Sequence, residues 1–276
     1  MVFVPHLRLN NGVSIPQLGF GVFQVPQGQT QRVVEDALEA GYRHIDTAAA
    51  YGNEAGVGAA IASSGIPREE IFITTKLRNG EQGMAAEAFE ASRHALGVDV
   101  IDLYLIHWPV PSRGLFVDAW QALEKINAAG RARAIGVSNF LANHLETLLA
   151  AANVIPAVNQ IELHPTFQQT VLSATTRAHG IAVEAYSPLG QGADLSAGAV
   201  TALARQHGAT PAQIVLAWHL GMGNIVIPKS AHGRRMRENL GAADIFLGRD
   251  EMDAVTALER GTRLSADPAE AAFSQM

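Results

Sequence analysis

The chain has 276 residues, of which 48% are hydrophobic and 17% charged, and its formal net charge at pH 7 is −6. This composition allows a large apolar core and excludes a globally disordered chain. With no cysteine, the chain has no disulfide, thiolate metal site or cysteine nucleophile. The acidic balance argues against a globally basic nucleic-acid-binding protein.

We expect neither an export signal nor a membrane anchor in this sequence. Residues 1–10 lack a basic stretch followed by an apolar one. The longest segment without Asp, Glu, Lys or Arg, residues 206–228, contains histidines, glycines and Pro211 and is too polar for a spanning helix. We therefore expect a cytoplasmic protein that binds neither membrane nor nucleic acid.

The first predicted element is a β-hairpin. Residues 7–9 and 13–15 flank Asn10-Asn11-Gly12, and Asn-Gly favours a tight turn. Short runs rich in Val and Ile then alternate with longer segments of helical character. The predicted strands are 18–21, 42–46, 71–76, 101–107, 134–138, 157–161, 181–185 and 225–228. The predicted helices are 29–40, 54–63, 84–96, 116–129, 141–151, 168–179 and 211–220.

Strands that alternate with helices in this way form a parallel sheet. No linker or shift in composition divides the chain, so we expect a single domain over residues 1–276. Eight such units predict an α/β fold, a closed (β/α)8 TIM barrel with an N-terminal β-hairpin cap and a short irregular C-terminal tail from Gly261. An open dinucleotide-binding sheet is less favoured, because Gly19-Phe20-Gly21 lacks the third glycine of that motif.

Ionisable side chains stand where several predicted strands end. Barrel enzymes carry catalytic groups at the C-terminal ends of their strands. Asp46, Lys76 and His107 end three successive strands, and Tyr51 follows Asp46 by five residues. Each has an ordinary structural explanation when taken alone, such as an ion pair between Asp46 and Lys76. Together the four predict an active site.

These four side chains suit the protonation of an oxygen atom. Tyrosine has a pKa of about 10, which a nearby ammonium such as that of Lys76 lowers by favouring tyrosinate. Asp46 would hold Lys76 charged and oriented, and a neutral His107 would orient a carbonyl by a hydrogen bond. No side chain supplies hydride, so the set implies a nicotinamide cofactor. No spacing of His, Asp and Glu predicts a metal site.

Three segments resemble the signatures of the aldo-keto reductase superfamily. They are Gly41–Glu54 (GYRHIDTAAAYGNE), Val137–Phe140 and Ile227–Ser230, in the order in which the family has them. The chain looks most similar to bacterial reductases of the 2,5-diketo-D-gluconate type. The resemblance implies a (β/α)8 barrel and NADPH-dependent carbonyl reduction, with the four residues above as the catalytic tetrad and Tyr51 as the proton donor.

The resemblance also implies where the NADPH cofactor binds. The nicotinamide carboxamide would be held by Ser138, Asn139 and Gln160, with Tyr186 stacked on the ring. The pyrophosphate would contact Ser187, Leu189 and Gln191, the 2′-phosphate Lys229, Ser230 and Arg235, and the adenine Glu238 and Asn239. Positive charge and hydrogen-bond donors at Lys229, Ser230 and Arg235 favour NADPH over NADH, although a solvated basic helix start would look the same.

Substrate binding is assigned to Phe23, Tyr51, His107 and Trp108. Arg78 stands where relatives often have tryptophan, and two interpretations stay open. It could bring charge to the pocket rim and favour acidic or hydroxylated substrates, or it could be an exposed loop arginine.

The leading hypothesis is a monomeric, NADPH-dependent reductase of small aldehydes and ketones, with diketo or keto-sugar acids such as 2,5-diketo-D-gluconate as candidate substrates. An alternative is an NADPH-binding sensor or interaction barrel with incidental reductase activity. The intact tetrad favours turnover, because a sensor could lose any of its members. A sugar-phosphate barrel enzyme is a third hypothesis, and it leaves Ser138, Asn139 and Gln160 unexplained.

Overall fold

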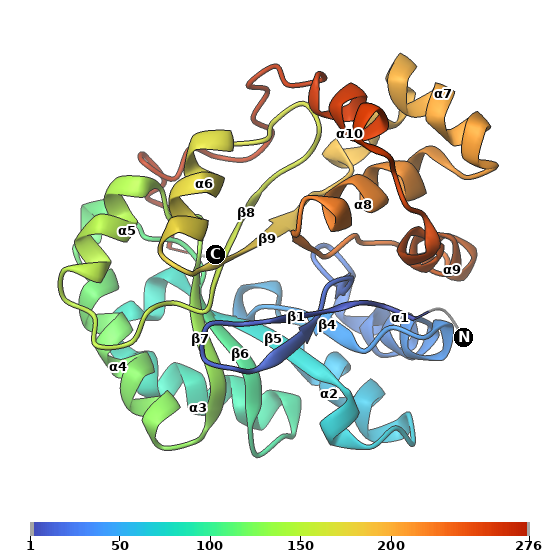
Figure 1. Cartoon of the computed structure of the whole chain (residues 1–276). Helices are drawn as coiled ribbons and strands as arrows, with labels where there is room; N and C mark the ends of the chain where they lie inside the picture. Colours follow the sequence, from blue (N-terminus) through green and yellow to red (C-terminus); the bar gives the residue numbers. More distant parts are fainter. Residues whose placement is uncertain (1–2, 275–276) are drawn as a thin grey trace.

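A computed structural model describes residues 3–274 and has the predicted (β/α)8 barrel architecture (Figure 1). Eight parallel strands form one sheet in chain order, and the last lies next to the first. Leu18 and Val226 form a parallel bridge, and Gly19 N donates to Val226 O at 2.8 Å. The strands are β3 (Phe20–Gly21), β4 (His44–Asp46), β5 (Phe72–Leu77), β6 (Ile101–Ile106), β7 (Ala132–Ser138), β8 (Val158–Glu162), β9 (Ala182–Tyr186) and β10 (Ile225–Val226).

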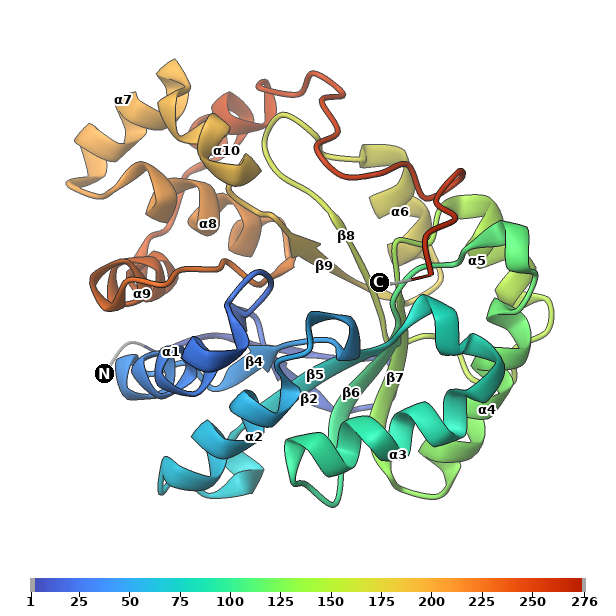
Figure 2. The ribbon, with the colours of Figure 1, turned by 180° about the vertical axis from the view of Figure 1, so that it is seen from behind.

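The seven predicted helices are present, and they surround the barrel (Figures 1 and 2). Each predicted helix and strand begins and ends within two residues of the observed bounds. The helices are α1 (Gln27–Ala40), α2 (Glu54–Ser63), α3 (Ala85–Leu96), α4 (Phe116–Ala128), α5 (Ala142–Leu149), α6 (Thr170–Ala178) and α8 (Pro211–Gly221).

The sequence analysis missed three helices of the described chain. They are α7 (Gly198–His207), α9 (Gly233–Leu240) and α10 (Arg249–Thr256), and they gather with α8 on one side of the barrel (Figure 1). In α9 only Met236, Asn239 and Leu240 are buried, so the periodic apolar stripe that marks a helix is almost absent.

The predicted N-terminal hairpin forms and closes one end of the barrel. Strands β1 (His6–Arg8) and β2 (Ser14–Pro16) pair antiparallel. Ile15 is fully buried in a cluster with Phe72, Val158 and Ile225, the first residues of three barrel strands. The hairpin therefore covers the end where the strands begin and leaves the end where the strands finish uncovered.

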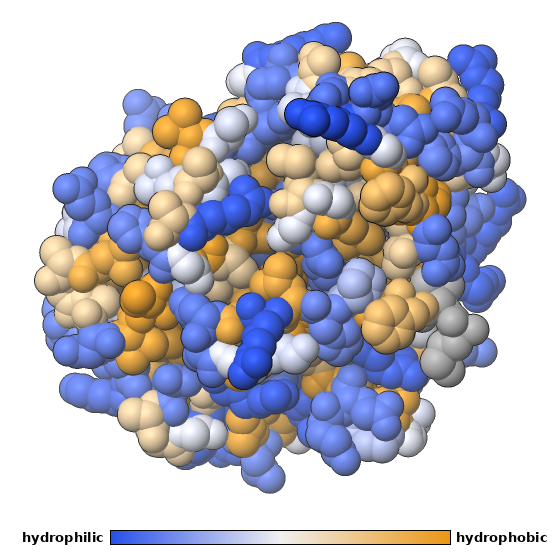
Figure 3. All heavy atoms as spheres, in the orientation of Figure 1, coloured by the Kyte–Doolittle hydropathy of each residue, from blue (hydrophilic) through white to orange (hydrophobic). Residues whose placement is uncertain are grey.

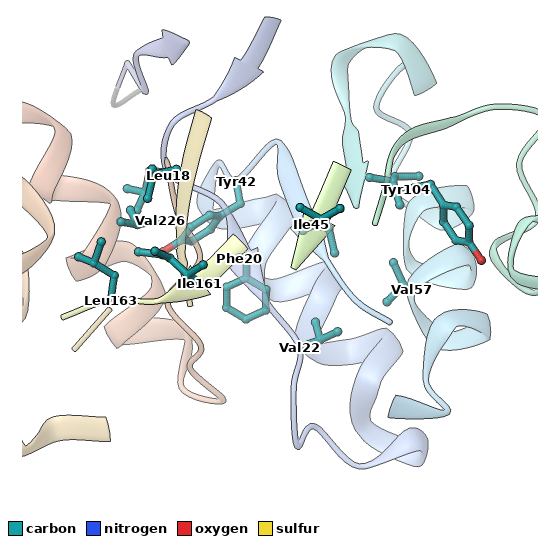
Figure 4. Close-up of a cluster of buried hydrophobic side chains, with 14 of the residues drawn as sticks. Leu18, Phe20, Val22, Tyr42, Ile45, Val57, Tyr104, Ile161, Leu163 and Val226 are labelled. Carbon is teal, nitrogen blue, oxygen red and sulfur yellow. The ribbon is translucent and has the colours of Figure 1, made fainter. Parts of the chain in front are cut away.

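The main core lies between the barrel and its helices. Phe20 and Tyr42 pack there with ring centroids 5.3 Å apart, close to Val22 and Ile45 (Figure 4). The Tyr42 hydroxyl donates to Met236 O at 3.2 Å and so fixes α9 against the barrel. Each fully buried side chain of this size contributes about 1.5–3 kcal/mol to folding.

The outer surface is mixed in character. Figure 3 shows hydrophilic and hydrophobic residues interspersed over the face that Figure 1 presents. In the part of the chain from residue 3 to residue 274, every helix is too short or too polar to cross a membrane.

Candidate active site

A pocket of about 820 Å³ lies at the end of the barrel where the strands finish. Of the residues predicted for catalysis, cofactor and substrate, all except Lys76 line it. The lining therefore includes Phe23, Asp46, Tyr51, His107, Trp108, Ser138, Asn139, Gln160, Tyr186, Ser187, Leu189, Gln191, Lys229, Ser230, Arg235, Glu238 and Asn239. The parallel sheet explains this convergence, because the C-terminal ends of all its strands meet at one rim.

Lys76 lies directly beneath the pocket, behind Asp46. Its side chain is fully buried, and its ammonium donates to both carboxylate oxygens of Asp46 at 2.7 and 2.8 Å and to Thr47 O at 2.8 Å. The predicted ion pair is therefore present, and every N–H of the ammonium has an acceptor. A buried charge requires this pairing to be tolerated.

Tyr51 lies above this pair on a 3-10 turn, Ala49–Tyr51, that follows β4. Its ring packs against Phe23 at 5.0 Å and His107 at 5.7 Å between centroids, and Lys76 Nζ lies 5.4 Å from the ring centroid. Burial, and secondly the Asp46 carboxylate, raise the pKa of Tyr51 well above its usual value. The expected lowering by Lys76 is therefore wrong for this structure. The physical reason is that burial disfavours the charged tyrosinate and the Asp46 carboxylate adds to this effect, so the hydroxyl stays protonated at neutral pH.

The His107 ring packs edge-on against that of Tyr51, and the imidazole is neutral. Burial, together with the charge of Lys76, lowers the pKa of His107 well below its usual value. Its backbone is fixed on both sides, because His107 N donates to Leu77 O at 3.3 Å and Asn139 Nδ2 donates to His107 O at 3.0 Å. A neutral imidazole carries one N–H, which can donate to an acceptor in the pocket.

Polar side chains from three further strands continue the pocket. Ser138 Oγ donates to Gln160 O at 2.9 Å, and Gln160 Nε2 donates to Asp46 Oδ2 at 2.9 Å. Tyr186 Oη donates to Asn139 Oδ1 at 2.8 Å. Within residues 3–274, no hydrogen bond to Gln160 Oε1 is present, so this acceptor can receive an amide N–H of a bound molecule. The set fits the carboxamide of a nicotinamide.

The other end of the pocket is positively charged. Lys229 and Arg235 line it, and neither forms an ion pair within residues 3–274. Glu238 is also there, but its carboxylate accepts from Arg234 Nε at 2.7 Å. Two cations without a carboxylate partner fit a phosphate group.

The structure contradicts one of the two open interpretations of Arg78, that of an exposed loop arginine. Arg78 is half-buried and does not line the pocket. Its Nη2 donates to Ala49 O at 3.0 Å and so holds the turn that carries Tyr51. Trp108 does line the pocket, and it also packs on Phe273 of the tail at 5.0 Å.

Several site residues escaped the sequence analysis. Gln24, Leu195, Thr210 and Ser265 also line the pocket. Ser265 lies in the irregular tail, where no motif or periodicity marks it. Glu184 on β9 is fully buried, and neither of its carboxylate oxygens has a hydrogen-bond partner among the described residues. Burial and the nearby Asp46 raise the pKa of Glu184 to about 8.

The barrel and its site place the chain in a known class of enzymes. The chain belongs to the aldo/keto reductase family, whose model matches residues 17–260. An aldo-keto reductase of Mycolicibacterium smegmatis is 52% identical over 266 residues, which are 96% of this chain and 97% of that protein.

Solved structures show the same architecture. An aldo/keto reductase from Brucella melitensis is 49% identical, with a TM-score of 0.91 over 94% of this chain and 99% of that one. A variant of Gox0644 in complex with NADPH is 43% identical, with a TM-score of 0.94 over 98% of this chain and 100% of that one.

Proposed function

We propose that this protein reduces aldehydes and ketones with NADPH and that Tyr51 is the proton donor. One observation carries the proposal. Tyr51 and His107 share one end of a pocket with the buried Asp46–Lys76 pair, and the other end carries Lys229 and Arg235, which form no ion pair within residues 3–274. The NADPH complex of the relative Gox0644 supports the choice of cofactor.

Different groups of pocket residues would bind different parts of the cofactor. Ser138, Asn139 and Gln160 would hold the carboxamide, and Tyr186 would pack on the ring. Ser187, Leu189 and Gln191 would contact the pyrophosphate, Lys229, Ser230 and Arg235 the 2′-phosphate, and Glu238 and Asn239 the adenine. Bound NADPH supplies the hydride, which no side chain can provide.

The chain's own residues then handle the carbonyl oxygen. The His107 N–H donates a hydrogen bond to this oxygen and so orients the carbonyl. The Tyr51 hydroxyl gives its proton to the same oxygen as negative charge develops there. Lys76, held in place by Asp46, has its Nζ 5.4 Å from the centroid of the Tyr51 ring and attracts the charge that the phenol oxygen acquires.

The substrate end of the pocket is aromatic. Phe23 and Trp108 line it beside Tyr51 and His107. Arg78, fixed on Ala49 O, adds no charge to the lining. We propose small aldehydes, ketones and diketones as substrates, including keto-sugar acids such as 2,5-diketo-D-gluconate. We also propose that a monomer is active, because every residue in this mechanism comes from one chain.

The test is the consumption of NADPH, followed by nicotinamide absorbance, with a panel of aldehydes, diketones and keto-sugar acids, and with NADH in parallel. Turnover that prefers NADPH supports the proposal. Tight NADPH binding without turnover on any substrate would contradict it and favour a sensor. Absence of both binding and turnover would overturn the assignment of the pocket itself.

A further inference from the structure

Three buried ionisable side chains form a row just outside the pocket. Glu162 ends β8, His164 follows it by two residues, and Asp194 lies in the 3-10 segment Gly190–Ser196. His164 Nε2 is 3.2 Å from Glu162 Oε1, and His164 Nδ1 is 3.0 Å from Asp194 Oδ2. None of the three is more than 2% exposed, and none lines the pocket.

The row carries alternating charge. Burial alone would lower the pKa of His164, but hydrogen bonds to Asp194 and Glu162 outweigh burial and raise the pKa to about 9. Burial would likewise raise the pKa of Glu162, but hydrogen bonds from His164, Ser265 and Leu264 lower it to about 2. His164 is therefore an imidazolium shared by two carboxylates. Glu162 and Asp194 both stabilise the charged form of His164. The effect of removing one carboxylate therefore depends on whether the other is present.

Glu162 holds the C-terminal tail. Leu264 N donates to Glu162 Oε1 at 2.6 Å, Ser265 N donates to Oε2 at 2.8 Å, and the Ser265 hydroxyl also donates to Oε2. Ser265 lines the pocket, and its Oγ is 2.9 Å from Tyr186 Oη. In Figure 2 this tail, in dark red, runs past α6 on the side of β8. The carboxylate thus keeps the tail against the aromatic residue proposed to pack on the nicotinamide.

Asp194 holds the loop on the opposite side of His164. Thr166 Oγ1 donates to Asp194 Oδ1 at 2.8 Å. A Cβ at Gly190 would lie 2.6 Å from Asp194 Oδ2, and the φ of Gly190 is +56°. Only glycine fits this position without strain, and its small size lets the Asp194 carboxylate pack against the backbone of its own loop. The same loop contributes Gln191 and Leu195 to the pocket wall.

A second set of hydrogen bonds, at Thr166, connects the C-terminal tail and the Gly190–Ser196 loop. Thr166, whose hydroxyl donates to Asp194, also uses its backbone carbonyl. This carbonyl accepts hydrogen bonds from Arg260 N at 3.2 Å and from Thr262 N at 3.1 Å. The start of the tail and the loop are therefore both bonded to the chain that follows β8. This arrangement gives the two pocket walls one common support.

We propose that Glu162, His164 and Asp194 form a charged clamp that couples the tail at Leu264–Ser265 to the loop at Gly190–Ser196. The three are positioning residues, and the two walls of the pocket open together when the clamp is broken. This inference rests on the proposed function, since the loop and the tail enclose the proposed cofactor. Loss of either carboxylate then affects cofactor and substrate alike, although neither residue lines the pocket.

The test is a double-mutant cycle on the full chain with Glu162→Gln, Asp194→Asn and both together. The readouts are the rate of NADPH dissociation, by stopped-flow fluorescence, and the KM for a carbonyl substrate. Each single variant is expected to speed dissociation about tenfold and to raise KM as well. The double variant is expected to dissociate at nearly the rate of either single variant, because one break already releases both walls.

Fold-changes that multiply in the double variant would overturn the coupling. So would a Glu162→Gln variant that changes KM alone. Glu124→Gln is the matched control, since Glu124 also binds backbone N–H groups, of Asn153 and Val154, but lies away from the pocket. It is expected to leave dissociation unchanged. If the wild-type protein fails to bind NADPH, the proposed function fails instead of the coupling.

A milder substitution keeps the test available if the charge variants fold poorly. Thr166→Val removes the hydroxyl that donates to Asp194 and leaves all three charged residues in place. It is expected to speed NADPH dissociation about threefold and to raise KM in the same direction. An effect on dissociation with an unchanged KM would contradict the clamp.

Discussion

Lys76→Met removes the cation from the buried pair beneath the pocket while keeping a side chain of similar length. In the wild-type protein Asp46 receives two bonds from the ammonium, at 2.7 and 2.8 Å, and one from Gln160 Nε2 at 2.9 Å. The variant leaves Asp46 with the amide bond alone. Asp46 is 2% exposed, so little water can reach it to replace the lost partner.

The expected cost follows from this geometry. Two unit charges about 3 Å apart attract by roughly 6 kcal/mol at an effective dielectric constant of about 20, but part of this only offsets their desolvation. Removing one partner of a buried pair costs about 3–5 kcal/mol of unfolding free energy. For a chain of this size the melting temperature should fall by roughly 10 °C.

Urea unfolding and thermal melts measure this loss directly. The loss should grow as pH rises, because at low pH Asp46 of the variant takes up a proton and no longer bears an unpaired charge. Adding Asp46→Asn to Lys76→Met removes the uncompensated charge and should restore more than half of the lost stability. A Lys76→Met variant within about 1 kcal/mol of the wild type would refute this reasoning.

Three further predictions concern other parts of the molecule. Arg235→Ala should weaken NADPH binding at least about tenfold in a fluorescence titration and change NADH binding less than about threefold, because only NADPH has the 2′-phosphate; equal losses would remove that assignment. Burial raises the pKa of Glu184 from 4.5 to about 8, so the folded state holds a proton that the unfolded state releases, and the stability of the wild type should fall as pH rises through this window. Glu184→Gln should flatten that part of the curve, and an unchanged slope would argue against the raised pKa. Thr210→Ala removes the hydroxyl that accepts from Gln213 N at the start of α8 and should lower the unfolding free energy by about 1 kcal/mol; a loss under about 0.3 kcal/mol would show that this cap contributes little.

The barrel could be predicted because its strands are continuous apolar runs. All six residues of β6, Ile101–Ile106, are buried. Its one charged member, Asp102, accepts from Arg68, Arg133 and Ile73 N, so it does not break the pattern in space. By contrast, α9 has few apolar positions and depends on tertiary contacts such as the bond from Tyr42 to Met236 O. Propensity alone could not reveal that helix.

The sequence allowed us to predict which residues lie at the candidate site, but not how the site shifts their pKa values. Asp46, Tyr51, Lys76 and His107 were identifiable because strand ends converge in a barrel. The direction of the Tyr51 pKa shift could not be predicted from the sequence. Burial raises this pKa, and it outweighs the attraction of Lys76, which is already paired with Asp46. Ser265 had no local signal either, since its partner Glu162 lies 103 residues earlier in the chain.

The central claim is that Tyr51 protonates a carbonyl while NADPH occupies the same pocket. The most direct test compares wild type and Tyr51→Phe in two measurements on the same preparation, NADPH affinity by fluorescence and single-turnover oxidation of NADPH with the best carbonyl substrate of the panel. We predict NADPH affinity within about twofold of the wild type and a rate at least about a hundredfold lower. A Tyr51→Phe variant that oxidises NADPH at the wild-type rate would contradict the account.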